Sequence, residues 1–548
     1  MATNAPVLNT QSSSVLRPVI LHSLLFVLLM VTATGLSALF TAVFHGFNAQ
    51  QVSTDQLAMA LTFTLVGIPL AWLLWRAVRK RLARPTAFDS AIWSLQASAV
   101  YLVTLAASSC ALLGLLAGFV SASPNDAWQS TLAVALGWGA VCLWQHRQIT
   151  SAHTAPRQFA QLAATVGNYF SLVLLALSLV ATLKASLEIL IRPEDTLVGP
   201  TGMPNLLTAL IWLAGSLGLW VWHWKLRRVQ QMADLLNNIL LVVLGLAAPA
   251  LAFLLMIAEL FSWVWPQAWT AQERAGLFHE GGPNLLAILI ASAVVWIYHQ
   301  SQLHSGLRSR SVISAAQLAL SAVSLAVLAT GLGMVVNALF AAIGSTVSVS
   351  YSAELLGYGL GLLGFGTAAW LWYFKPWKPS PADSRSAYLV LFFGASSVVA
   401  LISLLVFGYR IFEFYLEPES RLDSLLNTVR APLGWLVATA AVASYHFALW
   451  RTDKDAKAGS SGKSTTTRDA VTRRAVVIVG PAASEPMAAQ LKARPELSLI
   501  WIASAGSALD DRAEVSVLAR IDEYLACESG PVLAIANEDG TVQFTELA

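Results

Sequence analysis

Ionisable side chains within apolar segments are the residues of this sequence with the greatest capacity for chemistry. Lys184 and Glu188 are four residues apart near the end of one segment, Glu259 lies near the end of another, and Asn337 is closer to the middle of a third. Charged groups inside a bilayer are costly and often mark ion or proton paths. Near a segment end a long side chain can reach water, so a local ion pair between Lys184 and Glu188 is the simpler interpretation. A path through Lys184 and Glu259 is the alternative, and Asn337 is expected to join helices by hydrogen bonds.

An aromatic residue followed by a polar, basic or second aromatic residue recurs six times at the ends of apolar segments. Successive copies are separated by 69 to 78 residues. Trp and Tyr favour the headgroup level of a membrane, and a neighbouring His or Arg reaches lipid phosphate, so the motif predicts an interfacial anchor belt. The alternative is a recognition surface for a lipid headgroup or a protein, lined by His223, His299 and His446. We call this the exit motif, and its copies are Trp75-Arg76, Trp144-Gln145, Trp222-His223, Tyr298-His299, Trp372-Tyr373 and Tyr445-His446.

The sequence contains none of the common catalytic strings. Walker A, HExxH, GxSxG and CxxC patterns are all missing, and Cys110, Cys142 and Cys527 are too scattered for a disulfide framework or a zinc site. We therefore expect no catalytic, cofactor-binding or metal-ligating residue and no cofactor. A membrane-embedded enzyme is the least favoured class of function.

The composition places most of the chain in lipid. Of 548 residues, 56% are apolar and only 11% are charged, and the mean hydropathy is +0.64. A soluble protein carries about a quarter charged residues, so this chain could not cover its apolar surface with a soluble exterior. The formal net charge of +3 gives no bias toward nucleic acid, and none is expected as a partner.

Apolar segments of about 20 residues cross a bilayer as helices, and the sequence contains twelve of them. Each copy of the exit motif ends an even-numbered segment, which indicates six two-helix repeats with the same orientation in the membrane. The expected spans are residues 18–44, 56–76, 92–120, 129–145, 163–191, 204–224, 236–262, 283–299, 314–343, 354–374, 387–409 and 431–450. The repeats cover about 17–84, 88–148, 158–228, 234–305, 312–378 and 385–452, after a polar leader at 1–16.

The distribution of charge predicts the orientation of the spans. The connections that follow the exit motifs, together with the N-terminal leader, carry sixteen basic and three acidic residues, whereas the opposite set carries six basic and thirteen acidic residues. Basic connections stay on the cytoplasmic side, so both termini are expected to be cytoplasmic in a bacterial inner membrane.

Repeated strings support the repeat assignment, for example PNLLTALIWLAGSLGLWVWHWKLRR from Pro204 and GPNLLAILIASAVVWIYHQSQLH from Gly282. In these features residues 15 to 452 resemble bacterial integral-membrane proteins of unknown function that are built from tandem two-helix units and often carry a small soluble tail. The resemblance implies no established activity, and therefore no functional residue.

The C-terminal segment has the composition of a soluble domain behind a linker. Residues 453–472 are rich in Lys, Asp, Gly, Ser and Thr, which is typical of a flexible linker. Residues 473–548 alternate apolar runs with helical patterns and predict a small cytoplasmic α/β domain in the order βαβαββ.

The whole chain is thus expected to be an all-α polytopic membrane protein with a small α/β tail. The favoured function is a non-enzymatic scaffold whose tail binds a cytoplasmic protein, and the alternative is a transporter or lipid-handling protein with a cavity between the repeats. The oligomeric state is left open.

Overall fold

The structure is a computed structural model in which the chain divides into two compact units, Met1–Ala448 and Leu449–Ala548. We call them the membrane domain and the tail domain. The described residues are 10–47, 53–83, 85–121, 128–191, 202–232, 234–265, 268–306, 308–343, 349–374, 382–416, 422–462, 474–480, 497–503, 510–527, 532–537, 539 and 541–546.

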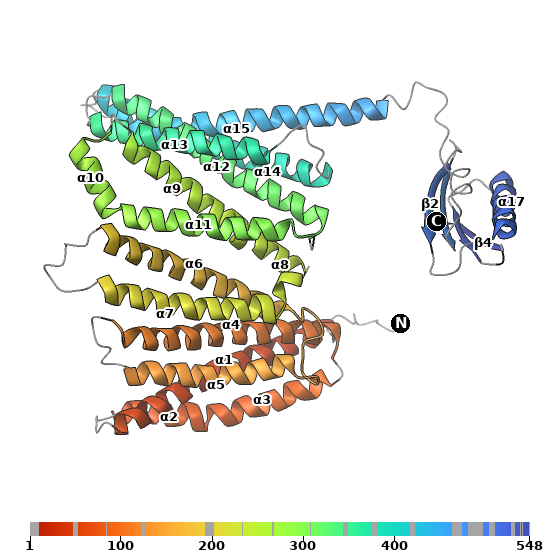
Figure 1. Cartoon of the computed structure of the whole chain (residues 1–548), viewed down its shortest axis with the longest axis horizontal. Coiled ribbons are helices and arrows are strands. Elements are labelled where there is room, and N and C mark those ends of the chain that lie inside the picture. The colour runs from red at the N-terminus through yellow and green to blue at the C-terminus, as the bar shows by residue number, and fades with distance from the viewer. Residues whose placement is uncertain are drawn as a thin grey trace, which may run out of the picture. The chain divides into compact units, whose positions relative to one another are not determined.

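Each repeat of the membrane domain contains two long helical segments, joined at one end (Figure 1). The first three repeats consist of α1 (Thr10–Phe47) with α2 (Thr54–Leu65) and α3 (Gly67–Leu82), α4 (Ala87–Gly118) with α5 (Trp128–Thr150), and α6 (Leu162–Ile191) with α7 (Gly202–Val221), η1 (Trp222–Leu226) and η2 (Val229–Gln231). The last three consist of α8 (Leu235–Leu240), η3 (Leu241–Ala247) and α9 (Ala248–Val264) with α10 (Ala271–Glu280) and α11 (Gly282–Leu303), α12 (Arg310–Ile343) with α13 (Val349–Tyr373), and α14 (Ala382–Leu416) with α15 (Leu422–Gly462).

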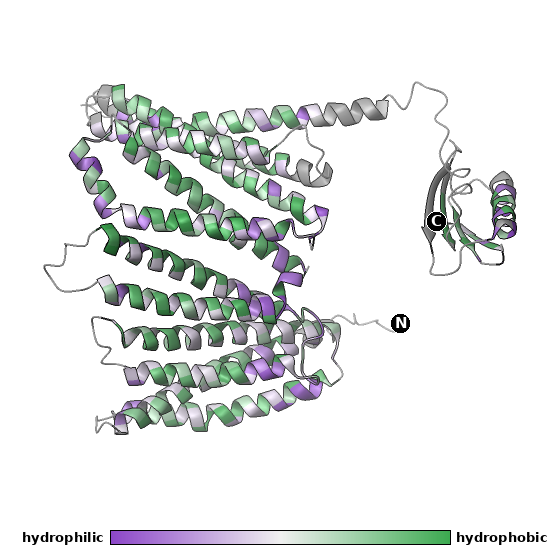
Figure 2. Ribbon diagram, in the orientation of Figure 1, coloured by the Kyte–Doolittle hydropathy of each residue, from purple (hydrophilic) through white to green (hydrophobic). Residues whose placement is uncertain are grey.

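Eleven helical segments of the described chain are long and apolar enough to cross a membrane, which confirms a polytopic all-α membrane domain. Figure 2 shows apolar residues along the helices and polar residues concentrated toward their ends. Of the twelve expected spans, α5 alone falls outside the eleven. Its 23 residues would rise about 34 Å, which is sufficient to span. Its Trp, Gln and Gly residues make the segment less apolar than its neighbours, although it packs against α1 and α4.

The repeats form a linear array. Every substantial contact between helices in the described part of the membrane domain joins two helices of one repeat or of successive repeats. Figure 1 shows the array running from α2 and α3 of the first repeat at the bottom, past α6 and α7, to α13 and α15 at the top. The exit motifs lie at the same end of this stack, which we call the exit end. Repeat proteins whose units contact only their neighbours have this architecture.

Two irregular points of the helices have a local cause. The second segment of the first repeat breaks at Val66, three residues before Pro69, because a proline lacks an N–H group and clashes with the preceding turn. The π-helical turn η3 ends at Ala247, two residues before Pro249, whose missing N–H removes one helical hydrogen bond. The second π-helical turn, η1, contains the His223 copy of the exit motif.

Glycines permit close packing between α12 and α13. A Cβ atom on Gly366 would lie 2.6 Å from the backbone nitrogen of Leu328, and one on Gly331 would overlap the backbone of Leu363. A Cβ on Gly364 of the same helix would meet no atom within 4 Å. The glycine-rich sequence from Gly357 to Gly366 therefore serves helix contact at particular positions.

The tail domain contains a four-stranded sheet with the order β2-β1-β3-β4. β1 (Arg474–Gly480) pairs in parallel with β2 (Leu497–Ala503) and β3 (Val532–Ala536), and β4 (Val542–Glu546) is antiparallel to β3. Helix α17 (Asp511–Cys527) buries Val517 and Ile521 against Ile478 and Ala534 of the sheet. These elements confirm the expected α/β domain. The first helix of the βαβαββ order, which the sequence predicts at about 484–494, lies outside the described residues.

Two local predictions for the tail can be compared with the structure. The Asp510 side chain accepts a hydrogen bond of 2.7 Å from the Ala513 N–H and so caps α17, as its position before the helix predicts. Helix α15 continues to Gly462, beyond the expected start of the linker at 453. The segment after Arg451 contains Lys and Ala, which favour helix.

Candidate functional site

Aromatic rings of the exit motifs join successive repeats. The ring of Trp75 lies 5.4 Å from that of Trp144. The same separation, between ring centroids, joins Trp220 to Tyr298 and Trp370 to Tyr445. In the latter two pairs the Trp lies two residues before the exit aromatic of its own repeat. Edge-to-face aromatic pairs at this distance stabilise packing, so the motif links neighbouring repeats as well as marking helix ends.

The six exit aromatics differ in exposure. Trp75 is buried, while Trp222 is 44% exposed and Trp372 is 72% exposed. Arg76 is exposed and stacks over the ring of Trp72 at 5.4 Å. Outward-facing members have the exposure that an anchor belt requires, whereas Trp75 packs between Trp93 and Trp144.

The three exit histidines are buried inside the helix packing. His223, His299 and His446 are each 1% exposed or less. In each, Nδ1 lies 2.8 Å from the backbone carbonyl four residues earlier, so Nδ1 carries the proton and donates it. The expectation that these side chains reach lipid phosphate, or line an exposed recognition surface, is therefore wrong. The hydrogen bond from Nδ1 to the preceding helical turn holds each imidazole ring against its own helix.

The Nε2 atoms of these histidines face different surroundings. The Tyr101 hydroxyl of the second repeat lies 3.0 Å from Nε2 of His223 and donates to it. Nε2 of His299 and of His446 has no hydrogen-bond partner among the described residues. Buried polar atoms are normally paired, so these two are candidates for pairing with water.

Glycines make room for two of the histidines. A Cβ on Gly167 of α6 would lie 2.5 Å from Nε2 of His223, and a Cβ on Gly245 of η3 would lie 2.8 Å from Cδ2 of His299. Both contacts involve a π-helical turn, since His223 belongs to η1 and Gly245 to η3. Such turns often occur where a side chain must be redirected, and here each brings a histidine against the other helix of its repeat.

The remaining second positions of the motif are less uniform. Gln145 is fully buried, and neither polar atom of its side chain has a described partner. Tyr373 is half-buried. Together with the histidines, these residues form a polar level inside the packing near the exit end.

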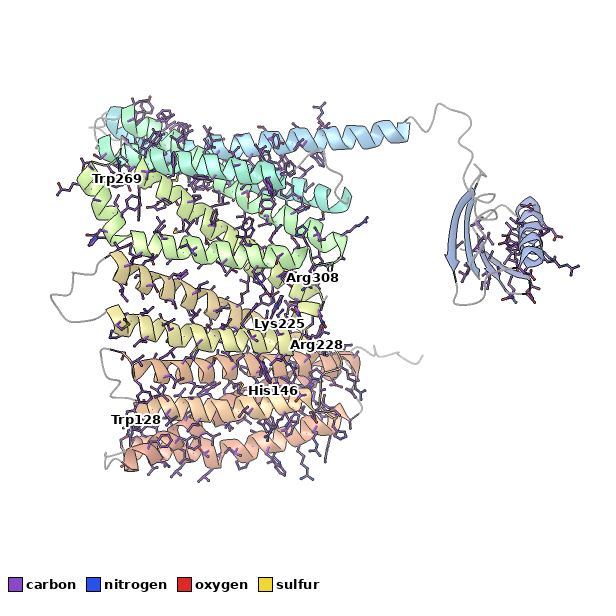
Figure 3. The ribbon with its side chains drawn as sticks, in the orientation of Figure 1. Trp128, His146, Lys225, Arg228, Trp269 and Arg308 are labelled. Atoms are coloured by element: carbon purple, nitrogen blue, oxygen red, sulfur yellow. The ribbon has the colours of Figure 1, made fainter. Side chains whose placement is uncertain are left out.

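Arg308, which the sequence marks only as a basic residue, forms a second polar junction: it lies between the fourth and fifth repeats and binds the segment that connects the third repeat to the fourth. It is 8% exposed and donates to the Met232 carbonyl at 2.5 Å, to Asn238 Oδ1 at 2.8 Å and to the Gln230 carbonyl at 3.3 Å. Burial lowers the pKa of Arg308, while Tyr169 and Asp234 act in the opposite direction. Figure 3 shows Arg308 with Lys225 and Arg228 at the exit end, and Trp128 and Trp269 at the opposite end.

Lys184 and Glu188 line an open cleft between α6 and α7. The Lys184 Nζ atom lies 3.8 Å from Glu188 Oε1, and the two side chains are 45% and 34% exposed. Asn205 and Thr208 of α7 contribute to the opposite wall. The cleft has a volume of about 430 Å³, which lies within the range of small-molecule sites.

Glu259 and Asn337 lie elsewhere. Glu259 of α9 accepts a hydrogen bond of 2.9 Å from Trp263 Nε1 on the same helix. Asn337 of α12 has a buried Oδ1 without a described partner. Neither lines the cleft of Lys184 and Glu188, so the structure does not join the four intramembrane candidates into one path.

Comparison with known proteins gives no identification. No family model, curated protein or solved structure matches the chain. Within the described residues, no three His, Cys, Asp or Glu side chains are arranged to hold a metal ion. The assignment of function therefore depends on the architecture, on the polar level and the Arg308 junction at the exit end, and on the cleft of Lys184 and Glu188.

Proposed function

We propose that the chain is a membrane scaffold that holds its tail domain at the cytoplasmic face of a bacterial inner membrane, where the tail binds a protein partner. The observation that carries this proposal is the linear array. In the described residues every substantial contact between repeats joins neighbours, and aromatic pairs and polar junctions connect them at one end. Arrays of this kind provide extended surfaces.

The cytoplasmic location of the tail follows from charge. The exit end carries most of the basic connections, and basic connections remain in the cytoplasm. Single cysteines at Ser305, at the exit end, and at Gln272, on the exposed α10, test this orientation in a chain lacking Cys110, Cys142 and Cys527. We expect a membrane-impermeant maleimide to label position 272 but not 305 in spheroplasts. Labelling of 305 alone would contradict the orientation.

A photo-crosslinking residue on the tail tests partner binding. Val515 of α17 is 67% exposed and apolar, which makes it a suitable position. We expect one discrete crosslinked protein in intact cells, with no product from the control position Asp539 in the exposed turn before β4. Products of many sizes from both positions, as from random collision, would contradict a specific partner.

The alternative of a transporter has one feature in its favour, the charged cleft at Lys184 and Glu188. The remaining intramembrane candidates do not extend that cleft through the membrane domain. Proton flux into liposomes that contain the full chain should therefore equal flux into empty liposomes. A flux that is lost in Lys184→Gln would favour transport over the scaffold.

A further inference from the structure

The cleft between α6 and α7 is polar at one end and apolar at the other. Lys184, Glu188 and Asn205 lie toward the end of the helices opposite the exit motif, where α6 ends at Ile191 and α7 begins at Gly202. Leu174, Leu177 and Trp212 line the part nearer the middle of both helices. The lining thus changes from charged to apolar along the direction of the helices.

The depth of the cleft matches the boundary of a bilayer. Lys184 lies between seven and eight residues beyond the midpoint of α6, a distance of about 11 Å at roughly 1.5 Å per residue. Half of the hydrocarbon thickness is about 15 Å, so Lys184 lies close to the boundary between acyl chains and headgroups. From Glu188 to Leu174 the lining extends over about 21 Å. A single bound molecule would place a polar group at the boundary and a chain below it.

The two charged side chains remain available to a ligand. Their separation of 3.8 Å exceeds hydrogen-bond length, and both side chains are partly exposed. By comparison, Arg410 and Glu413 of α14 approach to 2.7 Å. A Lys that precedes Glu by four residues is the less favourable order for a helical pair. The Lys184 ammonium and the Glu188 carboxylate can therefore each bind an opposite charge.

We infer that this cleft binds one membrane phospholipid whose headgroup carries both a phosphate and a primary ammonium. The phosphate lies beside Lys184, the ammonium lies beside Glu188, and an acyl chain lies along Leu177 and Trp212. The adjacent positive and negative groups of the protein complement the adjacent negative and positive groups of the headgroup. An anionic lipid has no ammonium group, so Glu188 would face either a neutral or a negatively charged part of its headgroup. This site goes beyond the scaffold role and requires no contribution from the tail domain.

The test uses the full chain in nanodiscs that contain trace photoactivatable phosphatidylethanolamine or phosphatidylglycerol. Crosslinked peptides are mapped by mass spectrometry. We expect the phosphatidylethanolamine probe to label residues 174–212 in preference to the phosphatidylglycerol probe. Glu188→Gln should reduce that preference by about threefold or more, because one partly exposed charge contact is lost. Lys184→Gln should reduce labelling by both probes.

Two further variants separate lipid binding in the cleft from the general effect of removing a charge. Ala181→Trp fills the cleft and leaves both charges in place, so it should abolish preferential labelling. Glu413→Gln removes a carboxylate from the other helical pair and should leave labelling unchanged. Size-exclusion chromatography and circular dichroism establish that each variant is folded. Equal labelling by the two probes in the wild type, a preference for phosphatidylglycerol, or an unchanged preference in Glu188→Gln would each overturn the proposal.

Discussion

The Tyr101 hydroxyl lies 3.0 Å from Nε2 of His223, and this buried hydrogen bond joins the second repeat to the third. The other ring nitrogen of His223 donates to the Leu219 carbonyl, so the imidazole is held from both sides. Gly167 packs against the same ring. One copy of the exit motif thereby becomes a structural connection between repeats.

Removal of this hydroxyl should weaken the connection. In Tyr101→Phe, Nε2 of His223 loses its donor while it remains buried, which should lower the free energy of unfolding by about 1–3 kcal/mol. Thermal unfolding of the detergent-solubilised chain measures the effect. Tyr409→Phe is the control, because its exposed hydroxyl makes only a 3.4 Å contact with Glu413. Equal stability of the two variants would show that the buried bond contributes nothing.

Close packing of α12 and α13 should depend on individual glycines. Gly366→Ala forces a Cβ against the backbone of Leu328, and overpacking of this kind costs about 1–3 kcal/mol. Gly364→Ala, on the same helix, meets open space and should be neutral or slightly stabilising. Thermal unfolding of both variants provides the comparison. A loss of stability in Gly364→Ala as large as that in Gly366→Ala would refute the specific contact.

The junction at Arg308 should protect the segment between the third and fourth repeats. Arg308→Ala removes three hydrogen bonds from a buried guanidinium and should cost about 2–3 kcal/mol. Limited proteolysis should then cleave faster near Met232. Arg310→Ala changes an exposed arginine two residues away and should leave cleavage unchanged. Identical cleavage rates in the two variants would contradict the assignment.

The start of α10 should be sensitive to acid. The Thr270 N–H and hydroxyl both donate to the Glu273 carboxylate at 2.8 Å, and these hydrogen bonds lower its pKa below the ordinary value of 4.5. A lowered pKa in the folded state means that the stabilisation is present above pH 4.5 and is lost as pH falls through the folded pKa. Hydrogen exchange at the Thr270 amide should show this loss of protection. Glu273→Gln should abolish the pH dependence, and its persistence in that variant would count against the capping box.

The sequence was sufficient to predict the elements that follow from hydropathy and local pattern. Apolar length predicts the helices because lipid requires satisfied backbone groups, and the spacing of the exit motif predicts the repeats. Residue type alone did not predict the burial of His223, because an aromatic and a histidine at a helix end are also typical of an interface. The Tyr101 partner lies 122 residues away and belongs to no repeated motif.

The same limit applies to the cleft and to the junction at Arg308. The spacing of Lys184 and Glu188 predicts their proximity, which the 3.8 Å separation agrees with. The opposite wall, with Asn205 and Thr208, depends on how α7 packs against α6. The sequence marks Arg308 only as one of the basic residues that predict orientation, because its buried acceptors are mostly backbone carbonyls, which carry no signal of residue type.

If the membrane domain localises a tail-bound partner, the distribution of that partner between membrane and soluble fractions must depend on the tail. The protein crosslinked through Val515 is quantified in cells that express the full chain or a chain ending at residue 452. We expect it in the membrane fraction with the full chain and in the soluble fraction with the truncated chain, while the truncated chain itself remains in the membrane. A partner that stays membrane-bound to the same extent without residues 453–548 would contradict the account.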